Sequence, residues 1–149
     1  MTSQLNVDTI VDKAGSGGTN VKVGNTSTYV SDGGSATQNT VQSLVKTWAN
    51  LNGTSFGLRD SFNLSSATDR ATGRYTFTKS NVMSNVNYSV TYNQNPHNAT
   101  SGGVTHIIGN GQGGNGNHST SEYQAECGVL NNGSDRDTDV FTMVAGDLA

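Results

Sequence analysis

The sequence predicts an all-β protein: an antiparallel β-sandwich or barrel-like domain that follows an extended N-terminal arm. Gly, Ser, Thr and Asn make up about half of the chain, and these residues favour turns and polar strand faces over helices. Apolar residues recur at every second position in several short runs, which is the period of a half-buried strand. These runs follow one another about every 10 residues with turn signals between them, as in sandwiches and barrels.

Composition sets limits on the class of protein. Of the 149 residues, 32% are hydrophobic and 13% are charged. A domain with so few hydrophobic residues cannot easily bury enough apolar surface by itself. We therefore expect copies of the chain to associate. The net charge of −3, without a Lys/Arg cluster, argues against nucleic-acid binding. No apolar run is long enough to span a bilayer, and the first residues lack the pattern of a signal peptide.

Residues 1–40 are predicted to form an extended anchoring arm, and residues 41–149 the β domain. Apolar side chains alternate along one face near the start of the arm, and Ile10 lies on the opposite face. Both faces are therefore expected to be buried. Gly- and Ser-rich stretches separate the strand-like pieces of the arm, which leaves few contacts within it. We therefore expect the arm to dock on a partner, the alternative being a partly disordered tail. The expected anchoring residues are Leu5, Val7, Ile10 and Val11.

Residues 41–51 fit two patterns. Val41, Leu44, Val45 and Trp48 have helical spacing, but the same stretch alternates as a strand. We predict a short helical turn over residues 40–43 and then a strand over residues 44–51, ending at the Asn-Gly turn signal of residues 52–53. That strand would place Val45, Thr47, Ala49 and Leu51 on one face.

Further strands are predicted over residues 55–64, 66–70, 74–79 and 86–92. The last of these alternates most regularly, with Val86, Tyr88, Val90 and Tyr92 on one face. After a loop that contains the single Pro, strands are predicted over residues 104–108, 123–129 and 139–145, which gives eight or nine in all. Cys127 alternates with apolar neighbours and is expected to be a small buried residue.

Two blocks of sequence resemble a known family. Residues 3–15, which contain LNVDTIV and KAG, are similar to the opening of many tail-fibre-like proteins of marine bacteriophages. Residues 44–92 resemble the fibre-tip domain of the same proteins through VKTW, NGT, RDSFNLSS, YTF and NYSV. The chain departs from that family in having no long shaft between the two blocks, and its C-terminal part does not match.

The resemblance implies a non-enzymatic virion protein, assembled in the host cytoplasm: a short homotrimeric appendage, anchored by its arm to other proteins of the tail or capsid. It implies host attachment, including contact with a cell-surface glycan. A capsid decoration protein with a knob-like domain is the first alternative, and a carbohydrate-binding β-sandwich module is the second. The aromatic residues assigned to packing within and between subunits are Trp48, Phe62, Tyr75, Phe77 and Tyr88.

The loops after residue 92 are the expected contact region. Gly109, Gly111 and Gly114 match the dinucleotide-binding fingerprint, but no helix start follows them, so we interpret this stretch as an exposed hairpin loop. A flexible loop of this kind can adapt to a target. The expected target-contact residues are His97, Asn98, Asn110, Gln112, Asn115 and His118.

Other chemistry has weaker support. In an extended segment Asp135, Asp137 and Asp139 would share one side, which suits a hard cation such as Ca²⁺, but Arg136 among them favours a solvated turn with ion pairs. A glycan hydrolase needs two facing carboxylates, and nothing in the sequence pairs the available acids. We therefore expect no enzymatic activity, no cofactor and no metal.

Overall fold

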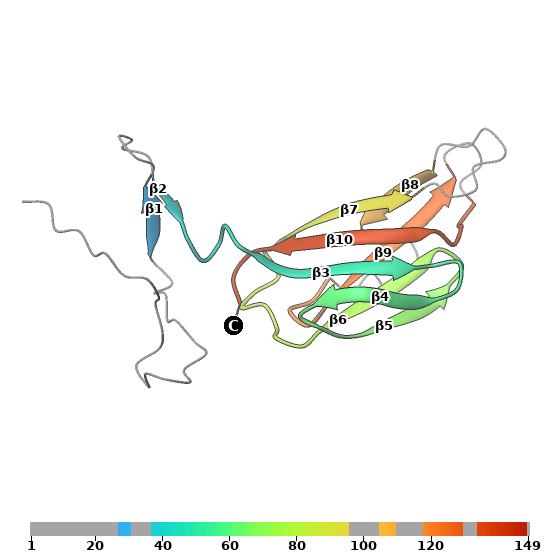
Figure 1. The fold of residues 1–149 in the computed structure, drawn as a ribbon, viewed down its shortest axis with the longest axis horizontal. Helices are drawn as coiled ribbons and strands as arrows, with labels where there is room; N and C mark the ends of the chain where they lie inside the picture. The colour runs from blue at the N-terminus through green and yellow to red at the C-terminus, as the bar shows by residue number, and fades with distance from the viewer. Residues whose placement is uncertain (1–26, 31–36, 96–104, 110–117, 130–133, 149) are drawn as a thin grey trace, which may run out of the picture. The chain divides into compact units, whose positions relative to one another are not determined.

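The structure, a computed structural model, describes residues 27–30, 37–95, 105–109, 118–129 and 134–148 (Figure 1). The chain divides into two compact units, Met1–Val41 and Gln42–Ala149. In the first unit, β1 (Thr28–Val30) pairs antiparallel with β2 (Thr37–Asn39). The expected anchoring residues of the arm lie outside the described residues.

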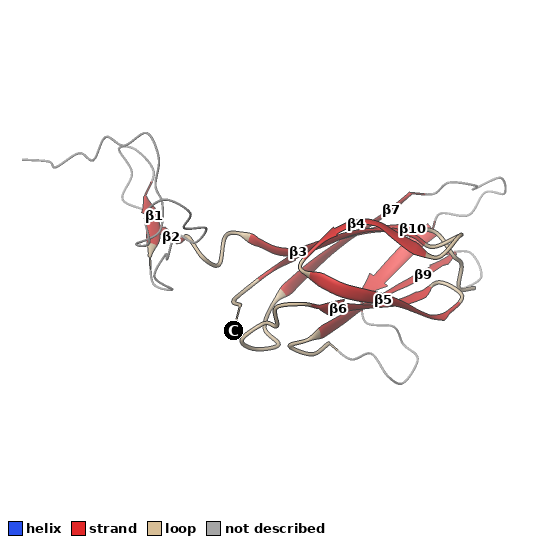
Figure 2. Cartoon of the chain, turned by 60° about the horizontal axis from the view of Figure 1, so that its bottom comes forward, coloured by secondary structure: helices blue, strands red, loops and turns tan. Residues whose placement is uncertain are grey.

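The second unit consists of two four-stranded antiparallel sheets that lie face to face, so the prediction of an all-β antiparallel fold is confirmed (Figure 2). The front sheet has the strand order β4-β3-β10-β7, and the back sheet has the order β5-β6-β9-β8. The strands are β3 (Val45–Asn52), β4 (Gly57–Phe62), β5 (Leu64–Ala71), β6 (Arg74–Lys79), β7 (Ser89–Asn95), β8 (Thr105–Gly109), β9 (Glu122–Val129) and β10 (Asp139–Ala145). The described residues include no helix, and hence no helix long and apolar enough to cross a membrane.

Residues 40–43 form a turn that leads into β3. Thr47, Ala49 and Leu51 face the interior, as the alternation predicts, and they are at most 3% exposed. The alternation also predicts Val45 on this inner face, but that prediction is wrong, because Val45 lies on the outer face. The pairing of β3 with β10 shifts between Val144 and Ala145, and this irregularity turns Val45 outward, where it is 44% exposed.

The predicted strand over residues 55–64 is two strands in two sheets. The chain passes from β4 in the front sheet to β5 in the back sheet at Asn63, whose φ of 58° is left-handed. The Asn63 side chain holds this corner: its amide donates to the carbonyl oxygens of Lys46 and Asn81 at 3.0 and 3.2 Å. Its carbonyl oxygen accepts the backbone N–H of Asn81 at 2.7 Å.

The strand predicted over residues 86–92 begins later, at Ser89, and Val86 is 50% exposed rather than buried. The Asn85 side-chain oxygen accepts the backbone N–H of Asn87 at 2.7 Å. This local bond favours a turn over an extended backbone just before β7. Strands β6 and β10 have the predicted bounds, residues 74–79 and 139–145.

The core lies between the two sheets and is small. Its buried hydrophobic residues are Ala49, Leu51, Tyr75, Phe77, Met83, Tyr88, Tyr123, Ala125, Cys127, Val140 and Val144. Tyrosine hydroxyls in this region are paired across the sandwich, as buried phenols require. The hydroxyls of Tyr123 and Thr142 lie 2.7 Å apart, and the Tyr92 hydroxyl donates to the Gln124 carbonyl at 2.7 Å. Hydrogen bonds between the sheets thus accompany a limited apolar core.

Candidate functional site

The three aspartates near β10 have separate partners. Asp135 forms an ion pair with Arg74 at 3.0 Å, and Asp139 forms one with Arg59 at 2.9 Å. Asp137 accepts hydrogen bonds from the Gly73 backbone N–H at 2.7 Å and the Tyr75 hydroxyl at 3.0 Å. Each carboxylate therefore fixes a different part of the sandwich. No group of three His, Cys, Asp or Glu side chains that could hold a metal ion occurs among the described residues.

A buried lysine lies at one end of the core. Lys79, the last residue of β6, is 4% exposed, and its Nζ donates to the Tyr88 hydroxyl at 3.0 Å. It also donates to the carbonyl oxygens of Ser119 and Thr120, each at 3.3 Å, and it lies 4.2 Å from the centre of the Tyr88 ring. These contacts tie the segment before β9 to β6. Sequence reasoning missed Lys79, although its alternation with Tyr75 and Phe77 places it on the buried face.

Burial perturbs the groups around this lysine. It lowers the pKa of Lys79 to about 8, against the opposing attraction of Glu122. Burial also raises the pKa of Tyr88 to about 12. The pKa of His118 is lowered by burial and by the nearby Lys79 charge. Burial therefore disfavours the protonated form of Lys79 in the folded protein, so the free energy of unfolding depends on pH.

We expect the contribution of Lys79 to the free energy of unfolding to rise by about 1 kcal/mol between pH 8 and pH 9. The pKa of Lys79 is lower in the folded state, so the unfolded chain binds more protons in this window and stability increases with pH. The Cys127 thiol opposes this rise within the same window, because burial raises its pKa to about 12 in the folded state while the unfolded thiol already ionises. Urea unfolding at a series of pH values measures this slope.

The control for the pH slope is Lys79→Met. This variant keeps the length of the side chain, and both carbonyls retain another donor, since Ser119 O accepts the Tyr88 hydroxyl and Thr120 O accepts the Met83 N–H. The variant should lose this contribution between pH 8 and pH 9. An equal dependence on pH in both proteins would show that Lys79 is not its source.

Of the expected target-contact residues, only His118 is described; His97, Asn98, Asn110, Gln112 and Asn115 lie outside the described residues. The His118 ring stacks on the Tyr88 ring, with 4.0 Å between the ring centres. Its partly buried position places it against the end of the core. His118 thus helps to fix the point at which this loop enters β9.

The five aromatic residues assigned to packing separate into two groups. Tyr75, Phe77 and Tyr88 are at most 9% exposed and belong to the core. Phe62 is 53% exposed, and Trp48 is partly buried. Trp48 and Phe62 lie directly opposite each other in the pairing of β3 with β4, on the outer face of the front sheet.

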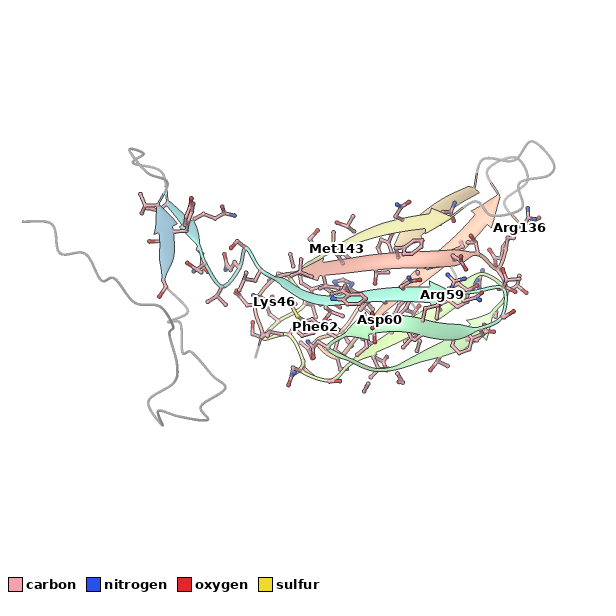
Figure 3. The ribbon with its side chains drawn as sticks, in the orientation of Figure 1. Lys46, Arg59, Asp60, Phe62, Arg136 and Met143 are labelled. Atoms are coloured by element: carbon pink, nitrogen blue, oxygen red, sulfur yellow. The ribbon has the colours of Figure 1, made fainter. Side chains whose placement is uncertain are left out.

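This outer face carries an apolar row across three neighbouring strands. In register, Phe62 of β4 pairs with Trp48 of β3, and Trp48 pairs with Met143 of β10. Figure 3 shows Phe62 and Met143 on either side of β3. Met143 is 52% exposed. We define the outer patch as Val45, Trp48, Phe62, Phe141 and Met143; Phe141 is partly buried and occupies the next outward position on β10.

The outer face of the back sheet has the opposite character. Two rows of outward positions run across β5, β6 and β9. One row consists of Ser66, Thr78 and Glu122, and the other consists of Thr68, Thr76 and Gln124. Arg74 on the same face forms an ion pair with Glu126 at 3.1 Å. A sheet face in contact with water is normally polar; the back sheet follows that rule, whereas the front sheet departs from it at the outer patch. The outer patch is therefore the candidate functional site.

Comparisons with models of protein families, with curated proteins and with solved structures found no match for this chain. The function of this protein is therefore inferred from its sequence and from the geometry of the site. Sequence reasoning singled out Trp48 and Phe62 but missed Met143, whose outward position follows from the inward positions of Thr142 and Val144.

Proposed function

We propose that this protein is a non-enzymatic structural protein of a phage particle, a short trimeric appendage used in host attachment. Its N-terminal arm anchors it to the particle, and its β-sandwich faces outward. The sequence resemblance of residues 3–15 and 44–92 to tail-fibre-like proteins supports this function. The structural observation that carries it is the outer patch, because exposed aromatic and Met side chains on one sheet face are typical of assembly surfaces.

The division of the chain fits this role. Residues 42–149 form a compact unit of their own, so the sandwich can be presented while the first unit is engaged elsewhere. Two strands of three residues each are described in the first unit, and Tyr29 and Val30 of β1 are 61% and 48% exposed. So small an element is stabilised by a partner, since an isolated hairpin is marginal in water.

A capsid decoration protein is the alternative that uses the same surfaces at another position on the particle. A carbohydrate-binding module has one specific observation in its favour: the aromatic pair Trp48 and Phe62 lies beside Asn50 and Asp60 on the outer face. Aromatic rings with neighbouring polar groups can hold a sugar. A glycan-binding assay on the isolated protein separates this candidate from a purely structural one.

Deletion of residues 1–40 tests the anchoring role. We expect the shortened protein to keep its cooperative thermal unfolding, because the sandwich has its own core, but to be absent from purified particles. Labelling the full-length protein and imaging intact particles locates it on the tail or on the capsid. Incorporation of the shortened protein at the level of the full chain would contradict anchoring by the arm.

A further inference from the structure

We propose that the outer face of the front sheet is the interface between copies of this chain, with the outer patch at its centre. The number of copies, three, rests on the proposed function. The occupant of each face is the same face of the other copies, which three copies share around a three-fold axis.

The residues of the outer patch are those that stable interfaces concentrate at their centres. Trp, Phe and Met are enriched in the buried part of protein interfaces, and a few such residues supply most of the binding free energy. Phe62 and Met143 are each about half exposed and flank Trp48 in one cross-strand row. Val45, 44% exposed, extends the apolar surface toward the start of β3. The centre of this face is therefore apolar over three strands.

The charge pattern of this face suits a second copy. The five residues of the patch are uncharged, so two patches meet without repulsion between like charges. The exposed carboxylate of Asp60 lies on the same face beside Phe62, at the margin of the patch. The ion pair beside the patch, Arg59 with Asp139, is bidentate, at 2.9 and 3.1 Å, and carries no net charge. A strongly charged partner would find nothing to complement on the patch. A like, uncharged patch is the complementary one.

Strand addition is disfavoured at two of the four sheet edges, those formed by β4 and β5. The edge strand β4 has an irregular register opposite Asn50 and Leu51, and it carries Arg59 and Asp60. The edge strand β5 has two irregularities and carries Asp69 and Arg70, both exposed. Bulges and charges on edge strands are the usual protection against edge-to-edge pairing.

A sugar fits the row of Phe62, Trp48 and Met143 less well than a second copy of the chain does. The cross-strand neighbours of Trp48 are Phe62 and Met143, so hydroxyl groups of a sugar stacked there would meet apolar side chains on both sides. Another copy of the row brings side chains that need no hydrogen bonds. The low apolar content of the chain, 32%, adds a reason for copies to share their apolar surface.

The test is the mass of the full-length protein in solution, by sedimentation equilibrium and light scattering, for the natural chain and for Phe62→Glu. We expect the natural chain to associate and the variant to weaken association by about 100-fold or more, because a carboxylate would be buried at the centre of the interface. The matched control is Phe56→Glu: Phe56 is 40% exposed but lies in the turn after β3, off the patch. This control should associate like the natural chain.

The outcomes separate the interface from the proposed function. A trimer that Phe62→Glu dissociates supports both. A dimer that this variant dissociates supports the interface and contradicts the trimeric appendage. A stable monomer of the natural chain overturns the interface, as does an oligomer that Phe62→Glu leaves intact; glycan binding by that monomer would assign the patch to a sugar.

Oxidation of Met143 by peroxide gives a second measurement that needs no variant. In the associated protein Met143 should be protected, and its oxidation should accelerate several-fold on dilution to the monomer. The internal reference is Met83, which is 1% exposed in the core and should stay slow at both concentrations. A rate for Met143 that does not change with association would overturn its place in the interface.

Discussion

Replacement of Gly73 by Ala should destabilise the β-sandwich by about 3–5 kcal/mol. Gly73 has a φ of +69°, which an L side chain rarely adopts, and it joins β5 to β6 at a crowded turn. A Cβ there would overlap the Cys127 carbonyl oxygen and lie 2.7 Å from the backbone nitrogen of Arg136. These are backbone atoms, so the clash cannot be relieved by a change of rotamer.

The turn at Gly73 cannot shift easily, because three segments meet there. Its carbonyl accepts the Cys127 N–H at 2.7 Å, and the Cys127 carbonyl in turn accepts the Arg136 N–H at 2.9 Å. Chemical denaturation measures the loss. The matched control is Gly57→Ala, where the nearest atom is 3.7 Å from the new Cβ and which should change stability by less than about 1 kcal/mol. Equal stability of the two variants would contradict this account of Gly73.

Replacement of Phe77 by Ala should cost about 3–5 kcal/mol. Phe77 is fully buried in β6, and its ring stacks on that of Tyr123 with 4.9 Å between the ring centres. Removing the ring leaves a cavity in a core with few other large apolar side chains, so little can move to fill it. Thermal and urea unfolding of the purified variant measure the effect.

The same substitution at Phe62 is the control for Phe77. Phe62 is 53% exposed, so Phe62→Ala should change the stability of the dilute protein by no more than about 1 kcal/mol. Both variants must be compared at one low protein concentration, because association stabilises the folded state and Phe62 belongs to the proposed interface. A large loss at Phe62 in dilute solution would place it in the core instead.

Elements with regular alternation were predictable. Tyr75 and Phe77 in β6, and Tyr123 and Cys127 in β9, face the core as their period of two requires. Where local hydrogen bonds compete with alternation, the prediction was wrong, as at Val86. The corner at Asn63 was also missed, because a left-handed residue inside an apolar run leaves no mark on the hydrophobic period.

The candidate site was predictable only in part. Trp48 and Phe62 stood out as aromatic residues, but one-dimensional alternation does not say whether an aromatic residue faces the other sheet or the outside. Met143 joins them because β10 pairs with β3, and those strands are separated by most of the chain. The separate pairing of Asp135, Asp137 and Asp139 likewise depends on Arg74, Tyr75 and Arg59 in other strands.

The sequence by itself determined the class of fold: its abundant turn residues, scarce charges and short alternating runs specify antiparallel strands. Only the tertiary structure decided what each strand face meets, because that depends on the order and register of strands distant in sequence. It buried Lys79 beside Tyr88 and left Trp48, Phe62 and Met143 together on an outer face. Alternation defines two faces of a strand, and packing decides which of them is covered.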